Sequence, residues 1–264
     1  YTIAYLFHYK IVACKRTIGN LILSIMKAII LAAGCGSRLN PLSKNTPKCL
    51  LKIDGVNRLI DFQVRPLIKN KIQDIVVVVG FRSEQIINYL KRKYPRANFM
   101  FIHNPDFLNT GAAYSMWLAQ RHLTGPFLYL NSDVLCDPLV IKKIISHPKS
   151  SATAFQKIPW NKEAVNIVTD EKNEITEIGK HISPQNSTGE FIGVTKIGKI
   201  FAKHLMGSLE YLIKNDAKKA FCVDAINFAI KTHRSKMFAL DISDLAAIEI
   251  DYPKDLRRAR RDIA

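Results

Sequence analysis

A glycine-rich segment followed by two basic residues is the part of the chain best suited to hold phosphate groups. Gly34 and Gly36 flank Cys35, and Arg38 and Lys48 come shortly after them. Glycines let the backbone turn tightly and bring N–H groups close to an anion, because no β carbon stands in the way. The planar fork of an arginine grips phosphate oxygens, and a lysine adds a mobile point charge. These residue types in this order predict a phosphate-binding loop.

The amino-acid sequence of this loop excludes two better-known phosphate-binding motifs. A Walker A loop needs Gly-x-x-x-x-Gly-Lys followed by Ser or Thr, and no such string occurs in the chain. A dinucleotide-binding fingerprint needs a third glycine where Leu39 stands. The string that is present is longer: Leu31-Ala32-Ala33-Gly34-x-Gly36-Ser37-Arg38-Leu39-x-Pro41-Leu42, with Pro47-Lys48 behind it.

Asp133 and Asp251 each follow an apolar, strand-like run and are candidates for a metal site. Mg²⁺ in proteins commonly takes one or two carboxylates together with phosphate oxygens and water. The competing role for each aspartate is a helix cap, and Asp251 with Tyr252-Pro253 resembles a helix start. Asp137 and Glu249 are neighbouring carboxylates that compete for the metal role.

The elements that carry these residues predict an α/β fold with a Rossmann-like, doubly wound mixed sheet and a small antiparallel lobe. Apolar runs typical of buried parallel strands alternate with helical patterns at first, and shorter strand-like pieces follow after Pro148. The runs are Lys27–Ala33, Ile75–Val79, Phe99–Ile102 and Phe127–Leu130, the helical patterns Ile60–Asn70 and Ser83–Tyr94, and the later pieces Ala152–Gln156, Ala164–Thr169, Ile175–Ile178 and Phe191–Lys196. Helices at about Gly198–Asn215 and Val223–Lys231, a strand at Ala246–Ile250 and a basic helix from Pro253 complete the expected elements.

Parallel sheets bind ligands at the carboxyl ends of their strands, where loops and helix N-termini supply N–H groups. The glycine loop, Asp133 and Asp251 all come directly after predicted strands. We therefore expect them to face one cleft.

The length of 264 residues and the hydrophobic share of 48% fit one large domain with a full core. Residues 1–25 contain no acidic residue, and Lys10 and Lys15-Arg16 interrupt two apolar stretches that are too short to span a bilayer. They also lack the single apolar region of a signal peptide. We interpret residues 1–25 as an extension outside the fold and residues 26–264 as a single domain. The five cysteines lack zinc-ligand spacing, which favours a reducing, cytoplasmic setting.

The formal charge of +17 attracts polyanions such as nucleic acid, nucleotides or an anionic membrane face. The basic residues are scattered and gather only at Arg257–Arg261, and no run alternates them with aromatic residues as a single-strand binding face would. This distribution favours a solvated basic surface over nucleic-acid binding.

The long glycine-loop string resembles the signature of the nucleoside-triphosphate transferase family, which includes sugar-phosphate nucleotidyltransferases and bacterial phosphocholine cytidylyltransferases. The resemblance extends from Met26 to the C-terminus and implies a nucleotidyltransferase that uses Mg²⁺. It implies that residues 26–148 bind the NTP and that residues 149–264 form an acceptor lobe and the closing elements. Asp133 becomes the first metal aspartate and Asp251 the second, and Arg38 and Lys48 become catalytic cations. The implied nucleotide-binding residues of the loop are Leu31, Ala32, Ala33, Gly34, Gly36 and Ser37.

Such a reaction demands little covalent chemistry from the protein. An acceptor phosphate has a second pKa near 6 and is largely dianionic at neutral pH, so no general base is needed. Catalysis would consist of aligning the acceptor oxygen and neutralising charge with Mg²⁺, Arg38 and Lys48 as pyrophosphate leaves. Ile175–Lys180 looks like the family segment that ends in an acceptor-binding lysine, although an exposed turn lysine is an equal alternative for Lys180.

The segment from Asn109 to Leu118 resembles the part of the family that reaches the nucleobase. It implies that Asn109, Thr110, Gly111 and Ser115 bind the nucleotide. Tyr114-Ser115-Met116 is similar to the phosphocholine enzymes, whereas Gly111-Ala112 departs from them. CTP is therefore the favoured nucleotide, with UTP or dTTP second.

The acceptor predicted from the resemblance is a phosphorylated small alcohol such as phosphocholine or another aminoalkyl phosphate or phosphonate. An amine or trimethylammonium group binds well to an aromatic face with a carboxylate nearby. Trp160 and Asp224 are the expected acceptor-binding residues, with Glu190 as a further candidate. Lobe packing for Trp160 and a helix cap for Asp224 are the competing roles.

Other functions remain open at this stage. A sugar-1-phosphate nucleotidyltransferase is the alternative within enzymes, and a regulatory subunit that keeps the fold without catalysis is the alternative outside them. The presence of Arg38, Lys48, Asp133 and Asp251 together argues against a regulatory copy, which has no physical need of all four. The sequence does not determine the oligomeric state.

Overall fold

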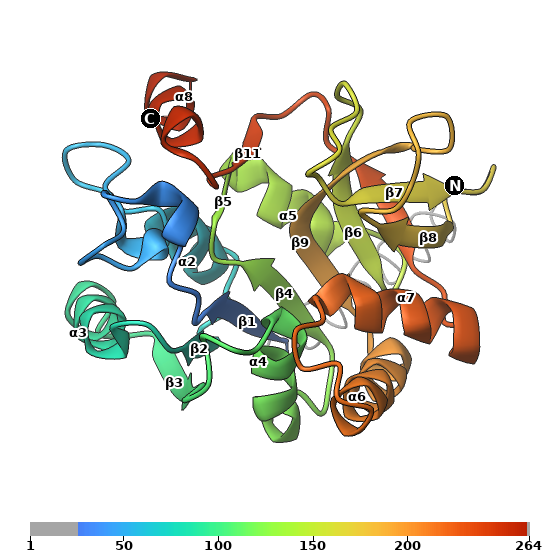
Figure 1. Ribbon diagram of the computed structural model, residues 1–264, viewed down its shortest axis with the longest axis horizontal. Helices are drawn as coiled ribbons and strands as arrows, with labels where there is room; N and C mark the ends of the chain where they lie inside the picture. Colours follow the sequence, from blue (N-terminus) through green and yellow to red (C-terminus); the bar gives the residue numbers. More distant parts are fainter. Residues whose placement is uncertain (1–25, 263–264) are drawn as a thin grey trace, which may run out of the picture.

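A mixed sheet of nine strands forms the centre of the molecule in the computed structural model, which describes residues 26–262 (Figure 1). The interpretation of residues 1–25 as an extension lies outside the described residues. The strand order is β10-β6-β9-β4-β1-β2-β3, with β7 and β8 beside β9. The strands are β1 (Lys27–Ala32), β2 (Asp74–Val79), β3 (Asn98–His103), β4 (Phe127–Asn131), β6 (Ala152–Gln156), β7 (Asn166–Thr169), β8 (Ile175–Gly179), β9 (Gly189–Ile197) and β10 (Phe238–Asp241).

The apolar runs of the first half form the parallel part of this sheet. β1 pairs in parallel with both β2 and β4, and β2 pairs in parallel with β3. Strands buried on both faces need apolar side chains at successive positions, which accounts for the continuous run in β1. β9 is antiparallel to its neighbours β4 and β6.

Helices cover both faces of the sheet, as predicted for a doubly wound fold. Ile29 and Leu31 of β1 belong to the core that includes α4 (Ala112–Leu118), α6 (Lys199–Lys214) and α7 (Cys222–His233). Ala28 and Ile30 belong to the opposite core with α2 (Asp61–Lys69), α3 (Ser83–Lys93) and α5 (Pro138–Ser146). Successive side chains of a strand point to opposite faces, so β1 contributes to both cores.

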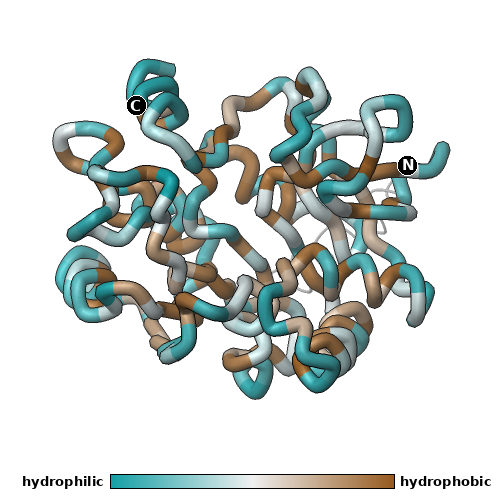
Figure 2. The backbone as a smooth tube through the Cα atoms, in the orientation of Figure 1, coloured by the Kyte–Doolittle hydropathy of each residue, from teal (hydrophilic) through white to brown (hydrophobic). Residues whose placement is uncertain are grey.

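A small two-stranded sheet stands beside the main one and has its own core. β5 (Val134–Cys136) pairs antiparallel with β11 (Ala247–Glu249), and α8 (Pro253–Asp262) packs over them through Leu256 and Ala259. The rest of α8 is hydrophilic (Figure 2). This small sheet brings the chain near residue 133 next to the chain near residue 250.

The predicted α/β class is confirmed, and the structure adds detail to the predicted lobe. β6 and β9 continue the main sheet, and the antiparallel β7–β8 hairpin joins it through β7, which pairs with β9. β5, α5 and β10 were not predicted from the sequence. Within residues 26–262, no helix combines the length and apolar character needed to cross a membrane.

Candidate active site

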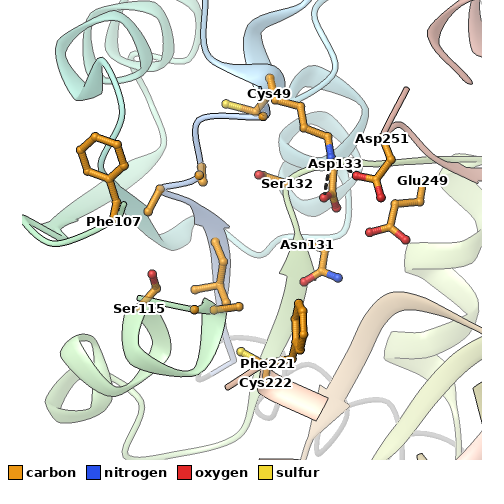
Figure 3. A pocket seen from close by; sticks show the side chains of 18 of the residues that line it. Cys49, Phe107, Ser115, Asn131, Ser132, Asp133, Phe221, Cys222, Glu249 and Asp251 are labelled. Carbon is orange, nitrogen blue, oxygen red and sulfur yellow. Dashed lines mark hydrogen bonds and ion pairs between the residues drawn. The ribbon is translucent and has the colours of Figure 1, made fainter. Parts of the chain in front are cut away.

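A cavity of about 380 Å³ lies at the carboxyl ends of β1 and β4 (Figure 3). Arg38 and Lys48, the predicted catalytic cations, line it together with Lys180, the lysine expected to act with them by binding the acceptor, and so do Asp133 and Asp251. The predicted nucleotide-binding residues that line it are Leu31, Ala32, Ala33, Gly34, Gly36, Ser37, Thr110, Gly111 and Ser115. Asn109 does not line the cavity, because its exposed side chain bonds to Asp106 instead.

Gly36 shapes the phosphate loop at the start of the cavity. Its φ angle of +63° lies in the left-handed region, and an added β carbon would stand 3.1 Å from Cβ of Lys48. Its carbonyl oxygen accepts hydrogen bonds from the hydroxyl of Ser43 and the N–H of Leu39. A glycine at this position therefore allows the loop to turn and the Lys48 side chain to pass close by.

Lys48 lies between the two predicted metal aspartates. Its Nζ is 2.9 Å from Oδ2 of Asp133 and 2.6 Å from Oδ1 of Asp251, and its side chain is only 12% exposed. Burial by itself would lower the pKa of Lys48, but the charges of Asp133 and Asp251 outweigh burial and raise it. Arg38 approaches the other oxygen of Asp251, with Nη2 2.7 Å from Oδ2.

Asp133, Glu249 and Asp251 form a group of carboxylates at one side of the cavity (Figure 3). One oxygen of each lies within 4.8 Å of the others. The charge of Asp133, followed by burial, raises the pKa of Glu249 to about 8. Oδ1 of Asp133 is buried without a hydrogen-bond partner among the described residues. An unpaired buried oxygen in a group of oxygen ligands fits a divalent cation such as Mg²⁺.

The competing role of a helix cap applies to Asp137 but not to Asp251. Asp137, a competing candidate, caps α5 by accepting a hydrogen bond from the N–H of Leu139. At the start of α8, Oδ2 of Asp255 accepts the N–H groups of Asp251 and Tyr252. The Asp251 carboxylate therefore remains directed at Arg38 and Lys48. Glu249, named from the sequence only as a competitor, lies beside both aspartates.

The side of the cavity away from the carboxylates is built on Asn104, which the sequence reading missed. Asn104 is buried directly after β3, and its amide donates to the hydroxyls of Thr110 and Ser115. Gly111 packs so tightly against the chain before α7 that an added β carbon would lie 2.3 Å from the carbonyl oxygen of Ala220. A polar residue placed just past a predicted strand was the available sequence signal for Asn104.

The predicted acceptor-binding residues are not brought to this cavity. The indole N–H of Trp160 donates to the carbonyl of Ile182 at 3.2 Å. Asp224 lies in the first turn of α7, where its Oδ2 accepts the N–H of Phe221 at 2.7 Å. This contact is the capping role that competed with acceptor binding for Asp224.

Glu190 lines a neighbouring cavity, and Lys180 and Phe221 line the first one. Glu190 lines a second cavity of about 700 Å³, and burial raises its pKa. In the first cavity, Nζ of Lys180 stands 5.5 Å from the centre of the Phe221 ring, which is 52% exposed.

Comparison with known proteins identifies the family of this site. Residues 27–177 match the family described as nucleotidyl transferase. The choline-phosphate cytidylyltransferase of Streptococcus pneumoniae is 38% identical over 130 residues, 49% of this chain and 52% of that protein. The CMP-5'-(3-aminopropyl)phosphonate synthase of Streptomyces rubellomurinus is 26% identical over 243 residues, 89% of this chain and 38% of that protein.

The chain spans about half or less of the length of these two curated relatives. A solved structure of the CTP:phosphocholine cytidylyltransferase from Streptococcus pneumoniae superposes with a TM-score of 0.73, at 23% identity over 90% of this chain and 99% of that one. This likeness shows the fold.

Proposed function

Because the chain belongs to the nucleotidyl transferase family, we propose that it transfers CMP from CTP to a small phosphorylated alcohol and releases pyrophosphate. The proposed acceptors are phosphocholine and other aminoalkyl phosphates or phosphonates. The observation that carries the proposal is the meeting of the glycine loop, Arg38 and Lys48 with three carboxylates in one cavity.

The loop and its cations would bind and orient the nucleotide. The N–H groups around Gly34 and Gly36 offer donors for phosphate oxygens, and Arg38 and Lys48 provide positive charge at the same place. The acceptor phosphate is itself the nucleophile and is largely dianionic at neutral pH, so the chain has no proton to remove. Its task is to hold the attacking oxygen in line with the α-phosphorus and to neutralise the leaving pyrophosphate.

Asp133, Glu249 and Asp251 would hold the metal of the proposed reaction. Mg²⁺ bound there would supply charge neutralisation for the phosphate oxygens. Lys48 and Arg38 now neutralise the Asp133 and Asp251 carboxylates, and both side chains lie beside the phosphate loop. Lys48 and Arg38 are thus placed to contact phosphate when a cation binds the carboxylates in their stead.

The choice of acceptor rests on the relatives and on the chemistry of the cavity wall. The names of two relatives specify choline phosphate and an aminopropylphosphonate, and both compounds join a cationic amine to a phosphorus acid. Lys180 offers a cation for the acid group, and Glu163 and the half-exposed ring of Phe221, which line the same cavity, suit an amine. This arrangement replaces the Trp160 and Asp224 pair expected from the sequence.

A pyrophosphate-release assay tests the proposal directly. CTP, UTP and dTTP are each offered with phosphocholine, 3-aminopropylphosphonate or glucose-1-phosphate in the presence of Mg²⁺. We expect the highest kcat/KM for CTP with one of the two aminoalkyl acceptors. Preferred turnover of glucose-1-phosphate would replace the proposal by a sugar-phosphate nucleotidyltransferase, and no turnover with any pair would remove its substrate assignment.

A further inference from the structure

Gln63 in the first turns of α2 contacts the chain on both sides of Asp133. Its Nε2 donates to the carbonyl oxygen of Asn131 at 2.6 Å and to that of Val134 at 2.9 Å. The side chain is 1% exposed, and its Oε1 has no hydrogen-bond partner among residues 26–262. The amide therefore acts here as a donor of two hydrogen bonds.

The two carbonyls belong to the turn that joins β4 to β5 and contains Asp133. At this turn the chain leaves the main sheet and enters the small one. A buried carbonyl left without a donor is costly, and a primary amide can serve two carbonyls at once because it carries two hydrogens. A glutamine at position 63 thus meets a need that an apolar side chain of the same size would leave unmet.

Backbone contacts fix the same turn from two other directions. The N–H of Ser132 donates to the carbonyl of Leu31 at the end of β1, and the N–H of Ile250 donates to the carbonyl of Asp133 at 2.9 Å. Leu31 leads into the phosphate loop, and Ile250 precedes Asp251. Gln63 adds a side-chain contact from α2 to this turn, which carries a carboxylate whose Oδ1 has no hydrogen-bond partner among the described residues.

We propose that Gln63 is a positioning residue that sets the Asp133 carboxylate relative to Glu249 and Asp251 and thereby tunes the affinity of the site for a divalent cation. Gln63 itself touches neither the cation nor the substrate. The part of this inference that concerns turnover rests on the proposed function, whereas the part that concerns the cation rests on the carboxylate geometry alone.

The test compares Gln63→Met with Tyr94→Phe in the full chain. Methionine keeps the length of the side chain and removes both donated bonds. Tyr94→Phe removes a part-buried hydrogen bond of 2.7 Å from the Tyr94 hydroxyl to Asp61, which lies on α2 like Gln63, and Tyr94 does not contact the Asp133 turn. Mn²⁺ is titrated into each nucleotide-free protein by calorimetry, and the Mg²⁺ concentration for half-maximal turnover is measured separately. Outer-shell partners of metal ligands are worth about 10- to 100-fold in metal affinity.

We expect Gln63→Met to weaken Mn²⁺ binding about tenfold and to raise the Mg²⁺ requirement similarly, with the KM for the nucleotide at saturating Mg²⁺ little changed. Tyr94→Phe should lower thermal stability and leave both metal measurements at the wild-type value. Wild-type metal affinity in Gln63→Met, or an equal loss in Tyr94→Phe, would overturn the inference.

Two further controls keep the outcome interpretable. If Gln63→Met does not fold by circular dichroism, Gln63→Asn, which keeps the amide on a shorter side chain, should show a smaller loss in the same direction. Wild-type protein that binds Mn²⁺ but turns over no substrate would count against the proposed function and leave the inference about Gln63 testable by calorimetry.

Discussion

The ammonium of Lys48 lies 2.9 Å from Oδ2 of Asp133, although the two residues are 85 positions apart in the chain. Without a bound metal, this ion pair places a cation of the protein between carboxylates that fit Mg²⁺. Binding of Mg²⁺ with a nucleotide would give the carboxylates a new partner and free Lys48 for the phosphates.

Lys48→Ala should lower kcat by about 100-fold or more, because it removes a cation placed next to the developing charge of the leaving pyrophosphate. The measurement is turnover at saturating substrates and Mg²⁺, with folding checked by circular dichroism. Lys44→Ala is the matched control, since Lys44 is an exposed lysine close by in the sequence that does not line the cavity. Turnover of Lys48→Ala within threefold of wild type would contradict the assignment.

Asp133→Asn should remove most activity and raise the Mg²⁺ requirement, because an amide oxygen carries no charge to hold the cation. Asp137→Ala is the control: loss of the α5 cap should cost about 1 kcal/mol of stability without changing turnover. Enzyme assays over a Mg²⁺ series and thermal melts distinguish the two effects. Equal activities for the two variants would refute the metal role of Asp133.

Removal of the metal with EDTA should abolish turnover, and added Mg²⁺ should restore it. The physical reason is that Asp133, Glu249 and Asp251 would hold the divalent cation that neutralises the phosphate oxygens during transfer. Stopped turnover that returns with excess Mg²⁺ is the expected result of the assay. Full activity in EDTA would exclude a catalytic metal at these carboxylates.

Lys180→Ala should raise the KM for the acceptor about tenfold and leave the KM for the nucleotide nearly unchanged, since it removes the charge proposed to bind the acceptor phosphate. Lys172→Ala, at an exposed lysine in the turn between β7 and β8, is the control. Initial-rate measurements with each substrate varied in turn provide both constants. An equal rise in both constants would place Lys180 elsewhere in the mechanism.

Glu190→Gln should stabilise the protein at pH 8 and have less effect at pH 4. Burial raises the pKa of Glu190 in the folded protein above its ordinary value of 4.5, so folding disfavours the ionised form. The wild type therefore loses stability as the pH rises from the unfolded pKa through the folded one, and below both values no penalty remains. Thermal melts across this range, with exposed Glu171→Gln as control, measure the difference. A gain in melting temperature for Glu190→Gln that does not increase with pH would show that burial does not disfavour the ionised form of Glu190.

The carboxylates illustrate how far the sequence could lead. Asp133 and Asp251 were identified because each follows an apolar run, and the carboxyl ends of strands meet at the sheet edge. The local sequence did not decide between metal and cap at Asp251, because that choice depends on which other group reaches the start of α8. In the structure Asp255 takes that place.

Gln63 and Asn104 show what local pattern does not reveal. Both are polar residues that are buried in the fold, and each donates hydrogen bonds to carbonyl or hydroxyl groups of other segments. Trp160 and Asp224 do not line the cavity: the indole N–H of Trp160 donates to the carbonyl of Ile182, and the Asp224 carboxylate accepts the N–H of Phe221. Partners of this kind are determined by packing between elements.

The parallel strands and the nucleotidyl transferase family could be recognised from the sequence alone. Backbone freedom at glycine and the burial of apolar runs are properties of short segments, so they can be read without the fold. Only the assembled fold places Glu249 beside the aspartates, because β11 pairs with β5 and sets Glu249 opposite Val134, next to Asp133. The fold also places Lys48 between Asp133 and Asp251. These aspartates are 85 and 203 positions away from Lys48 in the chain, and they meet it only in the assembled sheet.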